Sequence, residues 1–90
     1  MQVTWDPAKA GANLQKHGVR FSDAEGVLFD PLAITVEDRS ATGELRFVSI
    51  GADPFGRVLT VVYTHRGDDL RLISARRATR KERLQYEEGV

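Results

Sequence analysis

Apolar residues recur at short intervals along the chain, separated by glycine, proline and charged residues, and this pattern predicts five strands. β-Branched and aromatic residues favour extended structure at 2–5, 33–37, 45–51 and 58–65, and a further strand begins at Leu70. The stretch 58–65 is apolar on both faces, which is typical of a central strand. Short turns join the later strands into an antiparallel meander. The sequence therefore predicts an α+β fold in the order β-α-α-β-β-β-β-α, with an antiparallel sheet covered on one face by helices.

Capping signals predict where the first two helices begin and end. Asp6 is a favoured N-cap and Pro7 suits the first helical position. Gly18 can adopt the left-handed conformation that ends the first helix. Residues 22–25, Ser-Asp-Ala-Glu, match the capping-box pattern and predict the start of a second helix. That helix must end near Asp30, because the following proline disfavours helical conformation in the residue before it.

The C-terminal part of the chain passes from a strand into a helix. Strict alternation from Leu70 predicts that Leu72 and Ser74 share one face of the strand and that Arg76 continues their row, while Arg71 lies on the other face. Residues 79–82, Thr-Arg-Lys-Glu, match a capping box, so a helix from about 80 to 88 follows. The junction gathers four cations: Arg76, Arg77, Arg80 and Lys81. Because free amide groups at a helix start attract anions, this junction is a candidate phosphate-binding region.

Composition excludes several classes of function. A chain of 90 residues predicts one domain covering 1–90, and the absence of cysteine excludes disulfides and thiolate metal sites. We recognise no signal peptide and no apolar run long enough to cross a membrane, so we expect a cytoplasmic protein that binds no membrane. No phosphate-binding loop, dinucleotide fingerprint or metal-ligand cluster is evident, so we expect no metal or other cofactor.

The net charge is zero, but the charges are unevenly placed. Residues 22–45 hold six acids and one base, a net charge of −5, whereas residues 66–83 hold seven bases and three acids, a net charge of +4. The basic segment could bind phosphate or an acidic partner. Alternatively, the two segments neutralise each other across the sheet.

Two further places hold candidate acid–base groups. Lys16 and His17 end the first helix, where cations also complement the helix dipole. His17 could instead act in a functional site, because a histidine titrates near neutral pH. Arg46 lies on a strand near Glu44, on the same face. This pair is either an exposed salt bridge or a phosphate-binding arginine oriented by an acid.

The order of these residues resembles the BrnT family of toxins over nearly the whole chain. In the N-terminal half the resembling positions are Trp5-Asp6-Pro7-Ala8-Lys9-Ala10, Asn13, Lys16-His17-Gly18-Val19, Phe21, Ala24 and Phe29-Asp30. In the C-terminal half they are Asp38, Glu44, Arg46, Gly51, 59–63, Arg71, Ile73-Ser74-Ala75-Arg76, Ala78, Glu82-Arg83 and Tyr86.

The resemblance implies a RelE-like ribonuclease fold and a toxin of a type II toxin–antitoxin pair. Such a toxin halts translation by cutting RNA. It is neutralised by a BrnA-like antitoxin with a ribbon-helix-helix domain, and it reaches operator DNA only through that antitoxin.

We therefore expect a metal-independent endoribonuclease in which a general base activates the ribose 2′-hydroxyl for attack on the neighbouring phosphate. His17 is the first candidate for the general base or acid, and Glu44 is the second. We expect Arg46 and Arg76, from separate strands, to meet in one pocket and hold the phosphate. Lys16, Arg77, Arg80 and Lys81 would bind the RNA backbone. The alternative is a non-catalytic module that binds nucleic acid or a partner through the same basic face.

Overall fold

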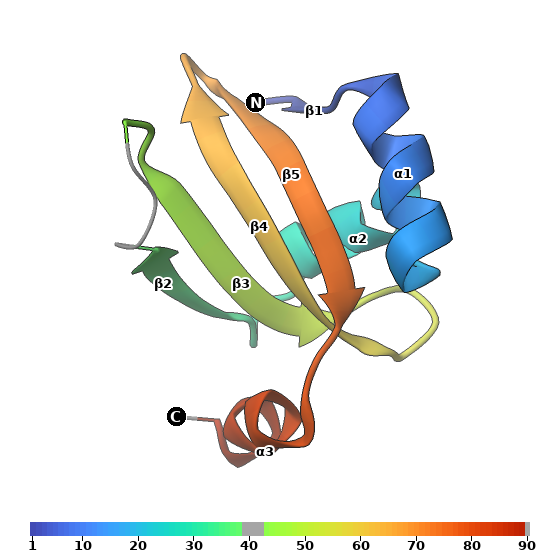
Figure 1. Cartoon of the computed structure of the whole chain (residues 1–90). Coiled ribbons are helices and arrows are strands. Elements are labelled where there is room, and N and C mark those ends of the chain that lie inside the picture. The colour runs from blue at the N-terminus through green and yellow to red at the C-terminus, as the bar shows by residue number, and fades with distance from the viewer. Residues whose placement is uncertain (39–42, 90) are drawn as a thin grey trace.

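The computed structural model describes residues 1–38 and 43–89, and these residues form five strands, three α-helices and one 3-10 helix (Figure 1). In chain order the elements are β1 (Val3–Thr4), α1 (Pro7–His17), α2 (Phe21–Ala24), the 3-10 helix η1 (Glu25–Phe29), β2 (Ile34–Asp38), β3 (Arg46–Ala52), β4 (Val58–Arg66), β5 (Asp69–Arg77) and α3 (Arg80–Glu88). The α+β class expected from the sequence is confirmed.

The strands form one mixed sheet in the order β1-β5-β4-β3-β2, so the doubly apolar β4 lies at the centre. The pairs β2–β3, β3–β4 and β4–β5 are antiparallel, whereas β1 pairs in parallel with β5. The expectation of a purely antiparallel sheet is therefore wrong at this edge. A parallel pair forms between strands far apart in the sequence, so no local turn signal marks it.

One face of the sheet and the first two helices enclose the hydrophobic core. The buried core residues are Val19, Phe21, Ala24, Val27, Leu59, Val61, Tyr63, Leu70, Leu72 and Ala75. In Figure 1, α2 lies behind the sheet, α1 lies beside β5, and α3 lies beyond the end of β5. The helices therefore do not all cover one face, because the chain leaves β5 and turns into α3 at the end of the sheet.

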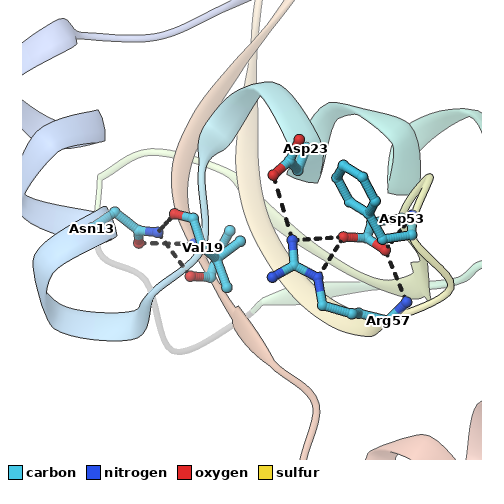
Figure 2. Close-up of polar contacts among 7 residues, drawn as sticks. Asn13, Val19, Asp23, Asp53 and Arg57 are labelled. Atoms are coloured by element: carbon cyan, nitrogen blue, oxygen red, sulfur yellow. Dashed lines mark hydrogen bonds and ion pairs between the residues drawn. The ribbon is translucent and has the colours of Figure 1, made fainter.

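Helix α1 begins and ends as its capping residues predict. The Asp6 carboxylate accepts a hydrogen bond from the amide of Ala8 at 2.8 Å, and Gly18 ends the helix with φ +69°. Near its middle, the buried Asn13 side chain binds the edge of β5. Its amide oxygen accepts from the N–H of Ala75 at 3.0 Å, and its Nδ2 donates to the carbonyls of Ala75 (2.9 Å) and Val19 (3.0 Å) (Figure 2). The Asn13 side chain thus forms hydrogen bonds with a part of the β5 edge that β1 does not cover.

The second helix begins two residues earlier than the capping-box pattern predicts. Helix α2 starts at Phe21 after Arg20, which makes no side-chain cap, and the chain tightens into η1 from Glu25 onward. Phe21 is 2% exposed in the core, so its burial sets the start of the helix in place of the local capping signal. Asp23 lies within the predicted capping box, but its carboxylate forms an ion pair with the Arg57 guanidinium at 3.4 Å.

The β3–β4 hairpin is fastened to α2 by charged groups (Figure 2). The 53–56 turn closes with a 3.0 Å hydrogen bond from the Gly56 N–H to the Asp53 carbonyl. The Asp53 carboxylate accepts from the Arg57 amide and from its Nε, both at 2.8 Å. The Arg57 guanidinium also reaches Asp23 of α2, so the turn, the strand and the helix share one ion-paired group.

Strand β5 contains a bulge that strict alternation does not predict. Tyr63 of β4 pairs with Leu72, but the next residue, Val62, pairs with Ser74. Ile73 is therefore an extra residue. Leu72 and Ala75 both point into the core, and Ser74 points to the opposite face. The expectation that Leu72 and Ser74 share a face is wrong, because the pairing of β5 with β4 depends on contacts remote in sequence.

Helix α3 has the predicted capping box and two anchors to the rest of the chain. Thr79 Oγ1 accepts from the Glu82 N–H at 3.2 Å, and the Glu82 carboxylate accepts from the Thr79 N–H at 2.8 Å. Glu82 is also the first anchor, through Arg76. The second is Tyr86, whose hydroxyl donates to Asp30 at 2.6 Å and whose pKa this bond raises.

Candidate functional site

The face of the sheet opposite α1 and α2, which we call the open face, carries two arginines in one row, with a threonine between them. Cross-strand pairing places Arg71 of β5 beside Thr64 of β4, and Thr64 beside Arg46 of β3. Asp38 of β2 lies on the other side of Arg46 in the same row. We call Arg71, Thr64 and Arg46 the arginine row. The adjacent row, which we call the valine row, consists of Ser74, Val62, Val48 and Val36. The open face thus sets cationic groups next to an apolar strip.

Arg46 has an unsatisfied polar atom. Its Nε is buried and has no hydrogen-bond partner in the described part of the chain. A buried donor without an acceptor costs about 1–3 kcal/mol. The neighbouring Thr64 hydroxyl is already committed, since it donates to the Leu45 carbonyl at 2.6 Å. Because this atom exposes almost no surface, an anion over the arginine row could accept from it only after the Arg46 side chain moves.

Arg76 lies on the same face but is held by a carboxylate. Its two terminal nitrogens donate to the two oxygens of Glu82 at 2.7 and 3.0 Å. This bond is the largest cause that lowers the pKa of Glu82 from 4.5 to about 2, and it also raises the pKa of Arg76. An incoming phosphate would have to displace Glu82 from Arg76 or share the arginine with it.

Arg46 and Arg76 do not meet. Arg46 pairs with Thr64, whereas Arg76 pairs with Thr60, four residues away along β4. At the usual rise of a strand this separates their rows by about 13 Å. The expected pocket shared by these two arginines is therefore not formed by their strands.

Glu44 is bound to a different arginine from the one expected. Its carboxylate lies 3.1 Å from the Arg66 guanidinium, in an ion pair whose side chains are 37% and 57% exposed. Glu44 precedes β3, which begins at Arg46.

Lys16 and His17 lie together at the edge of β5. They line a hollow of about 220 Å³, which also includes Ser74 of the valine row. The other lining residues are Lys9, Ala12, Asn13 and Ile73. Arg46, Arg71 and Arg76 do not line this hollow. His17 thus approaches the open face from the side of β5, and the hollow ends at Ser74.

The remaining predicted cations are exposed and lie apart from the arginine row. Arg77 pairs in register with the core residue Leu59, so it points away from the open face, as the sequence predicts for the neighbour of Arg76. Arg80 and Lys81 line a hollow of about 500 Å³ along α3. The eight predicted residues therefore fall into several groups on the surface.

Arg71 is the residue that sequence reasoning missed. Alternation placed it opposite Ser74, but the extra residue Ile73 brings Arg71, Ser74 and Arg76 onto the same face. The bulge depends on how β5 pairs with Tyr63, and no local pattern encodes it. The one usable signal is the short spacing between the buried Leu72 and Ala75, which strict alternation cannot place on one face.

Residues 1–38 and 43–89 contain no group of three histidine, cysteine, aspartate or glutamate side chains arranged to hold a metal ion. The helices in the same part of the chain are all too short and too polar to cross a membrane.

The fold and the open face first define a class: a small α+β protein with half-buried arginines on one face of its sheet. The family model described as "Ribonuclease toxin, BrnT, of type II toxin-antitoxin system" matches residues 5–82. The chain therefore belongs to the BrnT family of ribonuclease toxins of type II toxin–antitoxin systems, as its resemblance implied.

A solved structure agrees with this assignment. The crystal structure of the Brucella abortus ribonuclease toxin BrnT is similar to this chain with a TM-score of 0.71 and 28% sequence identity. The similarity covers 89% of this chain and 99% of that one. Comparison with curated proteins gives no match.

Proposed function

We propose that this chain is the toxin of a type II pair and acts as a metal-independent endoribonuclease. The observation that carries the proposal is the half-buried guanidinium of Arg46 on the open face, whose Nε has no hydrogen-bond partner among the described residues. The chain belongs to a family of ribonuclease toxins, so we infer that its substrate is RNA. A guanidinium without an acceptor can bind a phosphate of that RNA.

The proposed reaction is a transesterification within the RNA chain. A general base removes the proton of a ribose 2′-hydroxyl, and the oxygen attacks the adjacent phosphorus. The 5′-oxygen of the next nucleotide then leaves and takes up a proton from a general acid. The products are a 2′,3′-cyclic phosphate and a 5′-hydroxyl. Arg46 stabilises the negative charge that develops on the phosphate, and arginine supplies here the charge that a metal ion supplies in other nucleases.

The base and acid are the candidates that the sequence offers. His17 is supported by its position in the hollow that ends at Ser74, close to the edge of the open face. Glu44 is supported less, because its carboxylate is already paired with Arg66. We place Arg76 at a different phosphate of the RNA from Arg46, and only where Glu82 releases it. Lys16, Arg77, Arg80 and Lys81 would hold more distant parts of the RNA backbone.

The family suggests the consequence and the partner. RNA cleavage would inhibit translation and arrest growth. A BrnA-like antitoxin with a ribbon-helix-helix domain would neutralise the toxin and carry the complex to operator DNA. Expressing this chain alone, and then together with its neighbouring gene, should arrest growth in the first case only. Unimpaired growth and intact RNA on expression alone would contradict the proposal.

A biochemical test separates the nuclease from a binding module. Purified protein incubated with RNA in EDTA should yield fragments that end in 2′,3′-cyclic phosphates, as read by end-group analysis. Intact RNA in EDTA that is cut when Mg²⁺ is restored would show that the reaction needs a metal. RNA that is bound but intact under both conditions would favour the non-catalytic module.

A further inference from the structure

We propose that Arg71 and Arg46 together form a two-arginine site for one phosphodiester of the RNA chain, with the attached nucleoside lying on the valine row. This inference rests on the proposed ribonuclease function and extends it to a residue that neither the sequence pattern nor the family description assigns.

The bulge in β5 makes the site possible. Without the extra residue Ile73, Arg71 would point to the face opposite Ser74 and Arg76. With it, Arg71 and Arg46 flank Thr64 on the open face, each one strand away from it. Their backbones are separated by two strand spacings, about 10 Å, and two arginine side chains can close that distance over the small threonine. Bulges commonly re-aim a side chain next to a functional site.

Arg46 and Arg71 differ from the other half-buried arginines in their ion pairing. The structure describes four half-buried arginines: Arg46, Arg57, Arg71 and Arg76. Arg57 is paired with Asp53 and Asp23, and Arg76 is paired with Glu82. The ion pairs among the described residues include neither Arg46 nor Arg71, and these two lie in the same row. A half-buried guanidinium gives up part of its hydration, so an anion that accepts hydrogen bonds from both groups would compensate for that loss. Asp38 of β2 lies beside Arg46 in the same row, so the phosphate would have to bind on the Arg71 side of Arg46.

The surroundings favour a phosphodiester within a nucleic acid chain over a free anion. Val36 is 56% exposed, and Val48 and Val62 are partly buried, so the valine row offers an apolar surface directly beside the cationic one. A ribose and base can pack on such a strip while the phosphate accepts hydrogen bonds from both guanidinium groups. A small inorganic anion would leave the strip uncovered.

The direct test measures binding without cleavage. A fluorescent RNA oligonucleotide that is fully 2′-O-methylated lacks the attacking hydroxyl, so its affinity reports binding alone. Arg46→Ala and Arg71→Ala should each weaken this affinity about tenfold. The double variant should lose less than the product of the two effects, because both groups bind one phosphate. Arg20→Ala is the matched control, since Arg20 is exposed at the start of α2 and lies outside the proposed site.

Folding is controlled by two further measurements. Arg71→Gln keeps the length of the side chain and should show the same loss of affinity. Thermal unfolding of each variant should remain within a few degrees of the wild type. Equal affinity of wild type and Arg71→Gln for the modified RNA would overturn the inference. So would a loss no larger than that of Arg20→Ala, which would mean general electrostatic attraction only.

The outcomes also distinguish the two proposals. If the wild type cleaves RNA and both Arg71 variants bind and cleave normally, the two-arginine site is wrong and the nuclease stands. If the wild type binds the modified RNA through Arg71 but never cleaves unmodified RNA, the site stands and the nuclease is wrong. If Arg71 variants keep their RNA affinity but no longer bind the antitoxin, the row recognises an acidic protein, and the inference is overturned.

Discussion

At the scale of single residues, Glu82 performs two tasks that the sequence shows only in part. Its backbone and carboxylate complete the capping box of α3, which the local pattern predicts. The same carboxylate binds both terminal nitrogens of Arg76, six residues earlier, and this contact has no sequence signature. The ionised form of Glu82 is therefore stabilised in the folded chain, and its pKa falls to about 2.

This shift predicts a pH dependence of stability. The folded pKa of Glu82 lies below the ordinary value of 4.5, so its contribution is complete above about pH 4.5 and is lost as the pH falls toward 2. Because both side chains are partly exposed, we expect the contribution to be about 1–2 kcal/mol. Wild type should be more stable than Glu82→Gln by this amount at pH 6, and the difference should vanish near pH 2. Urea unfolding of both proteins over this range measures it, and a difference that does not change with pH would contradict the assignment.

Asn13 is the second residue whose contacts predict a large effect. Replacing it with alanine leaves the N–H of Ala75 and two carbonyls without partners in a buried place. Each such loss costs about 1–3 kcal/mol. We therefore expect Asn13→Ala to lower the free energy of unfolding by about 3 kcal/mol in urea titrations. Gln15→Ala, on the exposed side of α1, is the control. A cost below about 1 kcal/mol for Asn13→Ala would show that water replaces the amide.

At the scale of elements, the parts governed by neighbouring residues are predictable and the parts governed by distant contacts are not. Helices α1 and α3 begin at the capping residues that the sequence shows. Helix α2 begins instead where Phe21 is buried, and the bulge in β5 depends on its pairing with β4. The candidate site follows the same division. Local alternation predicts the face of Arg46 correctly. It does not predict the face of Arg71, because of the bulge in β5. It also does not predict that Arg76 binds Glu82.

The contact between η1 and the β3–β4 hairpin gives a prediction at this scale. A Cβ added at Gly26 would lie 2.8 Å from Pro54 Cδ and 3.1 Å from Pro54 Cγ, closer than side chains tolerate. Gly26→Ala should therefore destabilise the fold by about 1–3 kcal/mol. Gly11→Ala is a matched control, because nothing lies within 4 Å of its added Cβ in the middle of α1, and it should stabilise the fold by about 0.5–1 kcal/mol. Thermal unfolding compares the two, and equal effects would contradict the close packing.

At the scale of the whole molecule, the acidic and basic segments contact each other at few points among the described residues. The Arg66–Glu44 ion pair joins the two segments, and the Tyr86 hydroxyl adds a hydrogen bond to Asp30. Other acids form ion pairs elsewhere, such as Asp23 with Arg57 and Glu82 with Arg76. We propose that two arginines of the open face, Arg46 and Arg71, bind an outside anion. The zero net charge is thus compatible with a local cationic surface that would bind RNA.

We propose that Arg46 stabilises the negative charge that forms on the phosphate during cleavage. The most direct test is the single-turnover rate of RNA cleavage in EDTA, with protein in saturating excess, for wild type, Arg46→Ala and the control Arg20→Ala. We predict that Arg46→Ala cleaves about 10²–10³ times more slowly than wild type even when all the RNA is bound, while Arg20→Ala is unchanged. A saturated rate for Arg46→Ala equal to that of wild type would contradict the claim.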